Sequence, residues 1–117
     1  MDRSFGYAIE GIKTAIKEEP NIRIHLLIAA IVSFFAFLLK FNKTEWVILV
    51  FAISFVLILE LINTALEAIV DIVSPQIQKR AKTAKDVAAA AVLISAILSI
   101  IVGLFLFLPK ILTLNLF

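Results

Sequence analysis

The strongest constraint on this chain is an apolar helix that carries acidic side chains along one face. The uncharged run 46–59 leads directly into residues 60–71, with the sequence ELINTALEAIVD. Four polar residues in that segment recur at i, i+3, i+7 and i+11, which places them on one helical face: Glu60, Asn63, Glu67 and Asp71. Ionisable groups at a membrane boundary usually face a bundle interior or a water-filled cavity and mark function. The alternative interpretation is that the helix leaves the bilayer here and that these residues only face water. This interpretation is strongest for Asp71, which is close to Pro75.

The composition requires a membrane protein. Hydrophobic residues make up 62% of the 117 residues, and the mean hydropathy is +1.09. Soluble domains have about 45–50% apolar residues. The length fits one domain, 1–117. The chain has no cysteine, which excludes disulfides and thiolate metal sites. The first 20 residues carry charges throughout, so we expect no signal peptide.

The expected fold class is an all-α integral membrane protein with an N-terminal amphipathic surface helix and three transmembrane helices. Apolar residues recur every three or four positions in 4–19, opposite charged ones, which is typical of a helix lying in the membrane interface. Apolar runs predict spans at 22–40, 45–73 and 87–108, joined after the second span by a polar connection, 74–86.

Prolines and polar residues predict where these elements begin and end. Pro20 predicts a bend at Glu19, and Pro109 is expected to end the third span. Thr44 is a candidate cap for the second span. His25, the single histidine, is interpreted as a packing residue without chemistry.

The distribution of basic residues predicts the orientation of the chain in the membrane. Positive charge favours the cytoplasmic side. Eight basic residues lie in the N-terminal region and the 74–86 connection: Arg3, Lys13, Lys17, Arg23, Lys79, Arg80, Lys82 and Lys85. Three lie on the opposite side: Lys40, Lys43 and Lys110. The N-terminus and the 74–86 connection are therefore expected in the cytoplasm and the C-terminus outside. Acids able to hold a hard divalent cation then lie beside lysines able to meet phosphate, on the side that holds nucleoside triphosphate.

The spacing of the polar residues resembles that of a known family. The pattern Glu-x-x-Asn-x-x-x-Glu-x-x-x-Asp over 60–71, followed by Ala-Lys-Asp at 84–86, is similar to the prokaryotic integral membrane lipid kinases, which include diacylglycerol kinase and undecaprenol kinase. Gly6, Tyr7, Gly11 and Glu19 fall in register too, so the resemblance covers nearly the whole chain. The segments LINTA at 61–65 and FLPK at 107–110 are more similar to the undecaprenol branch.

The resemblance implies a homotrimer with active sites shared between subunits, which transfers the γ-phosphoryl group of ATP to a lipid alcohol. It implies that Glu60 is the general base and that Glu19 and Glu67 are ligands of Mg²⁺. Five further residues are implied to bind the nucleotide or support the site: Tyr7, Asn63, Asp71, Lys85 and Asp86. The chemistry agrees, because phosphoryl transfer depends mainly on positioning and charge neutralisation, and Mg²⁺ takes one or two carboxylates besides phosphate oxygens.

This chain departs from the family pattern in two places. It has Gln76 and Gln78 where the family often has histidine, and Ala88 to Ala91 where glycine often occurs. Neither change touches the implied base, metal ligands or phosphate lysine, but either could alter nucleotide contacts or helix approach.

Three other functions compete with undecaprenol phosphorylation. Diacylglycerol is the alternative substrate. A small cation-coupled transporter would place acids near mid-membrane in interrupted helices, whereas here they cluster toward one end of an unbroken span. A purely structural membrane subunit would leave the cost of burying Glu60 and Glu67 unexplained.

Overall fold

The structure, a computed structural model, describes residues 2–76 and 78–114 and consists of four helices in that part of the chain. They are α1 (Asp2–Glu18), α2 (Pro20–Leu38), α3 (Lys43–Val73) and α4 (Lys79–Leu112). Helices α2, α3 and α4 are each long and apolar enough to cross a membrane. The described residues form no strand. The predicted all-α membrane fold with three long apolar helices is therefore confirmed.

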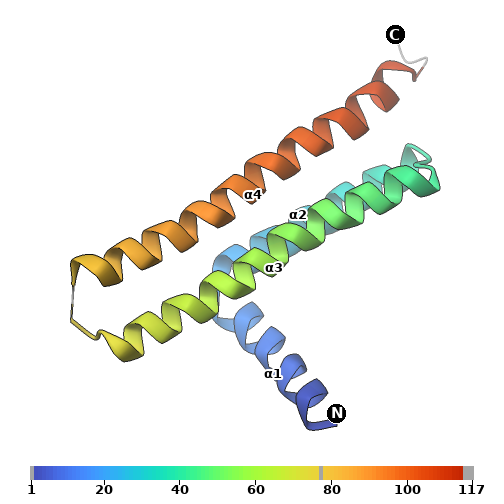
Figure 1. The fold of residues 1–117 in the computed structure, drawn as a ribbon. Coiled ribbons are helices and arrows are strands. Elements are labelled where there is room, and N and C mark those ends of the chain that lie inside the picture. Colours follow the sequence, from blue (N-terminus) through green and yellow to red (C-terminus); the bar gives the residue numbers. More distant parts are fainter. Residues whose placement is uncertain (1, 77, 115–117) are drawn as a thin grey trace.

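The three long helices run alongside one another, and α1 leaves this bundle at a steep angle (Figure 1). α3 makes most of its contacts with α4 and fewer with α2, while α1 contacts α2 and α3. The chain reverses direction between α2 and α3 and again between α3 and α4. The ends of α3 and α4 that carry the polar residues of 60–86 therefore lie at the same end of the bundle.

The predicted bend between α1 and α2 is present. Glu19 has extended backbone angles (φ −108°, ψ 107°), and Pro20 occupies the first turn of α2, where its missing N–H is not needed. Arg23 fixes the bend from the α2 side. Its Nη1 donates hydrogen bonds to the carbonyls of Ile16 at 2.9 Å and Lys17 at 2.8 Å. These carbonyls belong to the last turn of α1, where a cation is favourable. The location of α1 on the membrane surface stays a prediction.

Asn42, and not the predicted Thr44, caps the N-terminus of α3. Asn42 Oδ1 accepts a hydrogen bond from the backbone N–H of Glu45 at 2.8 Å, and Glu45 Oε1 accepts one from the backbone N–H of Asn42 at 2.9 Å. This pair is a capping box. Thr44 lies inside the first turn of α3, because the helix begins at Lys43, two residues earlier than a cap at Thr44 would require.

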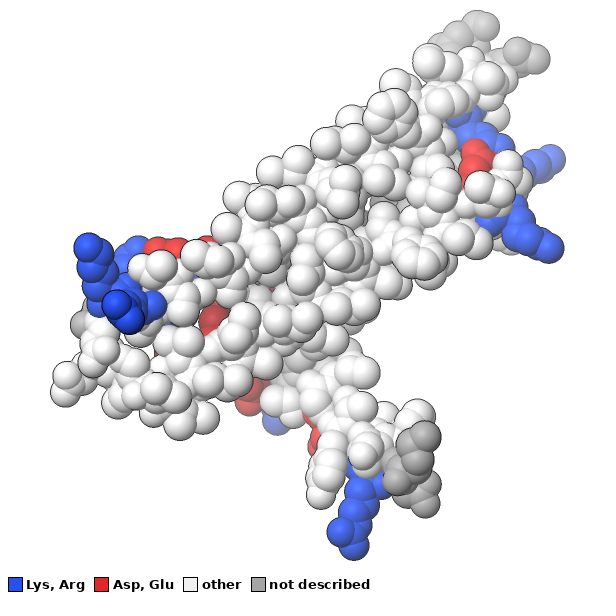
Figure 2. Space-filling view, viewed as in Figure 1, with Lys and Arg blue, Asp and Glu red and all other residues white. Residues whose placement is uncertain are grey.

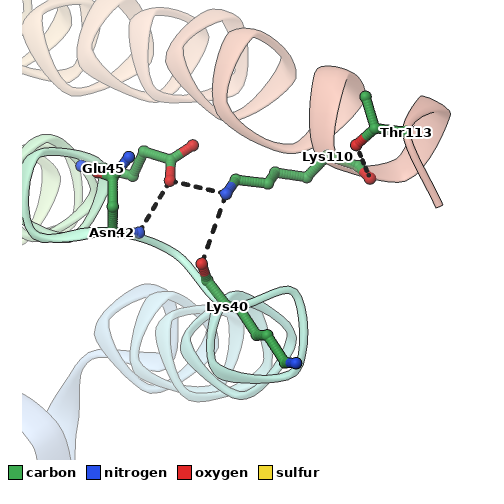
Figure 3. A network of polar contacts seen from close by, with 5 residues as sticks. All are labelled: Lys40, Asn42, Glu45, Lys110 and Thr113. Carbon is green, nitrogen blue, oxygen red and sulfur yellow. Dashed lines mark hydrogen bonds and ion pairs between the residues drawn. The ribbon is translucent and has the colours of Figure 1, made fainter.

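A polar network ties the end of α4 to this cap (Figure 3). Lys110 Nζ lies 3.1 Å from Glu45 Oε1 and donates to the backbone carbonyl of Lys40 at 3.4 Å. One lysine of α4 thereby contacts both the turn that follows α2 and the first turn of α3. The three long helices are joined at this end.

The hydrophobic core lies beside the same end of the bundle. Its buried members are Ala36, Phe41, Leu49 and Leu106, one or more from each long helix or its adjoining turn. The ring of Phe41 packs against Phe107 with centroids 4.8 Å apart and against Trp46 at 6.0 Å. Edge-to-face and tilted contacts of this kind are favourable beyond simple burial. The opposite end of the bundle, which carries the acidic stripe, has no comparable cluster among the described residues.

Helix α4 extends further in both directions than the sequence predicted. It begins at Lys79, so most of the predicted 74–86 connection is its first two turns. Pro109 does not end it, and that prediction is wrong: the helix continues to Leu112, and the Pro109 carbonyl accepts a hydrogen bond from Thr113 N at 3.1 Å. At 1.5 Å per residue, the 34 residues of α4 span about 51 Å, more than the roughly 30 Å hydrocarbon core.

Most large apolar side chains on the long helices are exposed. Figure 2 shows the complementary pattern on one face: Lys and Arg gather at the two ends of the bundle and along α1, with a broad, nearly uncharged band between them. Such a band is suited to lipid or to another copy of the chain. The homotrimer stays a prediction.

Candidate functional site

The acidic stripe on α3 runs from a buried to an exposed end. Glu60 is only 4% exposed. Asn63 and Glu67 are half-buried, and Asp71 is exposed near the helix C-terminus. The exposure of the predicted polar face therefore increases along α3 from the bundle interior toward the polar end of the bundle. Burying a carboxylate is costly unless it is paired. The burial of Glu60 therefore requires a polar partner, which apolar packing cannot provide.

Glu60 is paired with His25, a contact that the sequence interpretation missed. His25 Nε2 of α2 lies 3.3 Å from Glu60 Oε1 of α3. His25 was interpreted as a packing residue because nothing local in the sequence links two positions 35 residues apart. The signal that could have found it was the cost of a buried Glu60, which required a polar or cationic partner from another helix.

Asn63 and Glu67 are joined by a hydrogen bond one helical turn apart. Asn63 Nδ2 donates to Glu67 Oε1 at 3.0 Å. Asn63 Oδ1 is buried and has no hydrogen-bond partner among the described residues. Leaving a buried acceptor unpaired costs about 1–3 kcal/mol, and such an atom calls for an explanation. An oxygen left free beside a carboxylate is suited to a cation or to a donor from a ligand.

Two ion pairs lie at the polar end of α3 and α4. Lys85 of α4 donates a hydrogen bond to the Asp71 carboxylate of α3, which joins the two helices. Lys82 Nζ lies 2.6 Å from Asp86 Oδ2 one turn along α4. Lys85 precedes the apolar run that begins at Val87, and its hydrogen bond to Asp71 raises the pKa of its ammonium group. The site thus presents paired charges of both signs at the bundle end.

The other two predicted site residues, Tyr7 and Glu19, lie on different elements of the fold. Tyr7 of α1 is 73% exposed. Glu19, at the bend before α2, is half-buried. Among the described residues, no hydrogen bond or ion pair joins either side chain to the stripe on α3 or to α4. Six of the eight predicted site residues therefore lie on α3 and the first turns of α4, while Tyr7 lies on α1 and Glu19 at the bend before α2.

The donor set fits a hard divalent cation, although one chain supplies only part of it. The Glu67 carboxylate and the free Asn63 Oδ1 are adjacent oxygen donors, the kind that Mg²⁺ prefers. The described residues contain no group of three or more acidic, histidine or cysteine side chains able to hold a metal. Completing the coordination requires oxygens from elsewhere, such as phosphate groups, water or a second chain.

A groove between the three long helices begins at His25. It has a volume of about 420 Å³ and is lined by aliphatic and aromatic side chains of α2, α3 and α4, with His25 and Ser99 as its only polar side chains. From His25 it extends toward Leu104 and Phe107, near the opposite end of α4. An elongated apolar molecule with one polar end matches this lining.

Comparison with known proteins agrees with the pattern of residues. The family model for prokaryotic diacylglycerol kinase matches residues 6–107. The chain is 40% identical to the undecaprenol kinase of Bacillus subtilis (strain 168) over 108 residues, which cover 92% of this chain and 88% of that protein. It is 43% identical to the diacylglycerol kinase of Synechocystis over 112 residues, 95% of this chain but only 64% of that protein. It is 32% identical to the diacylglycerol kinase of Haemophilus influenzae over 102 residues.

Proposed function

The chain belongs to the prokaryotic diacylglycerol kinase family and is a lipid kinase, and we propose that it uses ATP and Mg²⁺ to phosphorylate undecaprenol in the bacterial inner membrane. The observation that carries this proposal is Glu60, a buried acid that contacts the polar end of an apolar groove through His25. A lipid alcohol whose hydrocarbon lies in that groove would present its hydroxyl at this point.

Undecaprenol is preferred to diacylglycerol as the acceptor. The undecaprenol kinase relative is covered over 88% of its length, whereas the diacylglycerol kinase with similar identity is covered over 64%. The segments LINTA and FLPK favour the same branch. Diacylglycerol remains the alternative substrate, because the relatives with that activity match nearly the whole of this chain too.

Glu60 acts as the general base. Its carboxylate accepts the proton of the lipid hydroxyl, the hydroxyl oxygen bonds to the γ-phosphorus of ATP, and the bond from that phosphorus to the bridging oxygen breaks to release ADP. The neighbouring apolar side chains exclude water that would otherwise compete as the acceptor.

Glu19 and Glu67 would hold Mg²⁺, with Asn63 as a supporting oxygen donor. The free Oδ1 of Asn63 and its bond to Glu67 support this assignment. When bound, the cation supplies charge neutralisation on the phosphate oxygens. Lys85 contacts the phosphates as a point charge, with Asp71 positioning its ammonium group.

The complete site requires a second subunit of a homotrimer. This part of the proposal is supported by the described residues of one chain, which include no group of three or more acidic, histidine or cysteine side chains able to hold a metal. Tyr7 and Asp86 then support the nucleotide from the cytoplasmic side, where the basic residues of the N-terminal region and of the first turns of α4 lie. The site, the N-terminus and the 74–86 segment face the cytoplasm, and the C-terminus faces outward.

The test is transfer of labelled phosphate from ATP to a panel of lipid alcohols by the purified protein. Glu60→Gln should reduce kcat by about 10²–10⁴-fold, the usual cost of losing a general base, while MgATP binding is retained. Glu10→Gln, which changes an exposed acid of α1, is the matched control and should be fully active. Near-normal turnover by Glu60→Gln would assign the proton to another group. Failure of the wild-type protein to label any lipid alcohol would refute the proposed function.

A further inference from the structure

The carboxylate of Glu60 depends on a single polar neighbour. Its side chain is 5% exposed, and among the described residues its only ion-pair or hydrogen-bond contact through the carboxylate is His25 Nε2 at 3.3 Å. The side-chain hydroxyl of Thr64 donates to the backbone carbonyl of Glu60 and not to its carboxylate. A buried acid with one partner is held in the orientation that this partner allows.

His25 has an environment different from that of Glu60. Its side chain is 25% exposed and lines the apolar groove, whereas Glu60 does not line it. His25 is the only titratable side chain in that lining. His25 thus contacts both the groove and the buried carboxylate, and a polar group at this end of the groove would meet the imidazole first.

We propose that His25 is a positioning residue for phosphoryl transfer, which orients the Glu60 carboxylate and the incoming lipid hydroxyl toward each other at the end of the groove. This inference rests on the proposed function and deepens it, because it assigns a role to a residue outside the set of acids, amide and lysine implied by the sequence. Glu60 remains the group that takes the proton.

The geometry favours orientation of the base by an imidazole. In hydrolytic triads a third group fixes the tautomer and direction of the base; here the roles are exchanged, with the imidazole fixing a carboxylate. Misplacing a catalytic group by about 1 Å can cost about 100-fold in rate. Because the residues that the structure describes provide no second polar partner for the Glu60 carboxylate, loss of His25 frees it to adopt other rotamers.

The position of His25 in the fold supports a fixed orientation. His25 lies one turn and a half after Pro20, whose ring sets the start of α2. Ile22, on the same stretch of α2, is only 3% exposed. Because Pro20 and the buried Ile22 fix the start of α2, the imidazole of His25 has a defined position along the helix axis, opposite Glu60.

Kinetics of paired variants test this role. His25→Ala should lower kcat about 10–100-fold with little change in the KM for MgATP. His25→Gln keeps an amide donor near the carboxylate and should restore part of the lost rate. Combined with Glu60→Gln, His25→Ala should cause little further loss, because residues that act as a unit are non-additive. Full additivity of the two losses, or equal losses for His25→Ala and His25→Gln, would overturn the proposal.

A measurement without turnover separates this inference from the proposed function. The chain contains one histidine, so protein labelled with ¹⁵N-histidine gives ring signals from His25 alone. Glu60→Gln should shift these signals, and Glu10→Gln should not. This comparison uses a folded protein even if His25→Ala fails to fold, and it remains informative if no lipid is phosphorylated. Identical His25 signals in wild type and Glu60→Gln would overturn the contact on which the proposal depends.

Discussion

Replacing Arg23 should weaken the response to Mg²⁺ without touching the acidic stripe. Its guanidinium bonds to the carbonyls of Ile16 and Lys17 and so holds the last turn of α1 against the start of α2. Glu19 lies at the bend between them. If Glu19 is a metal ligand, its placement depends on this bend. We therefore expect Arg23→Gln to raise the Mg²⁺ concentration required for half-maximal activity.

The magnitude follows from the two hydrogen bonds. A hydrogen bond contributes about 0.5–1.5 kcal/mol net, and exposure of Arg23 favours the low end, so the pair holds the bend by about 1–2 kcal/mol. Loss of about 1.4 kcal/mol corresponds to a factor of ten in an equilibrium. The apparent dissociation constant for Mg²⁺ equals the intrinsic constant divided by the fraction of molecules that keep the bend. A smaller fraction therefore means weaker apparent binding. We expect an increase of up to about tenfold in half-saturating Mg²⁺.

The assay is the rate of lipid phosphorylation as a function of free Mg²⁺ at saturating ATP and lipid. Arg3→Gln, which removes an exposed arginine from the first turn of α1, is the control for the change in charge. Arg23→Lys should give an intermediate effect, because an ammonium group can still reach the carbonyls at the end of α1. An unchanged Mg²⁺ response in Arg23→Gln, with normal maximal activity, would refute the link between the bend and the metal.

Three further outcomes are expected. Glu67→Gln should remain folded and membrane-inserted but lose Mg²⁺-dependent nucleotide binding, measured by equilibrium binding; retained binding would remove it from the metal site. In this cysteine-free chain, Lys79→Cys in intact cells should be protected from an impermeant thiol reagent and Lys43→Cys should react, and the reverse pattern would place the site on the side without ATP. Lys110→Met removes the contact with Glu45 and should lower the unfolding temperature modestly while leaving kcat unchanged; a large loss of kcat would show that this distant end contributes to the site.

Features that depend on neighbouring residues could be predicted from the sequence. The three long helices follow from continuous apolar runs, and the polar face of α3 follows from spacing within three turns. The Asn63–Glu67 hydrogen bond is a direct result of that spacing. Hydropathy located the apolar part of α4 but not its start, because residues 79–86 are polar and yet contain lysines and alanines, which favour helix strongly.

Features that depend on packing could not be predicted. The His25–Glu60 contact requires the rotation of α2 about its axis relative to α3, which no local pattern specifies. Asn42 and Thr44 are both good caps, and only the geometry of the turn decides between them. Pro109 was expected to end α4 because proline removes a hydrogen bond from a helix interior. Near a helix end that cost is small, and the helix continues for one more turn.

The packed core near Phe41 also determines which parts of the bundle can open most easily. At that end, Lys110 and the core cluster join the three long helices. At the site end, α3 and α4 are joined by the exposed Asp71–Lys85 pair, and exposed pairs contribute little to stability. Local opening is easiest where buried contacts are fewest, so amide hydrogen exchange should become faster along α4 from its C-terminal toward its N-terminal half. Rotation of α4 by about 5° around the packed end would displace its other end by about 4 Å over its length, which would widen the site end without disturbing the core.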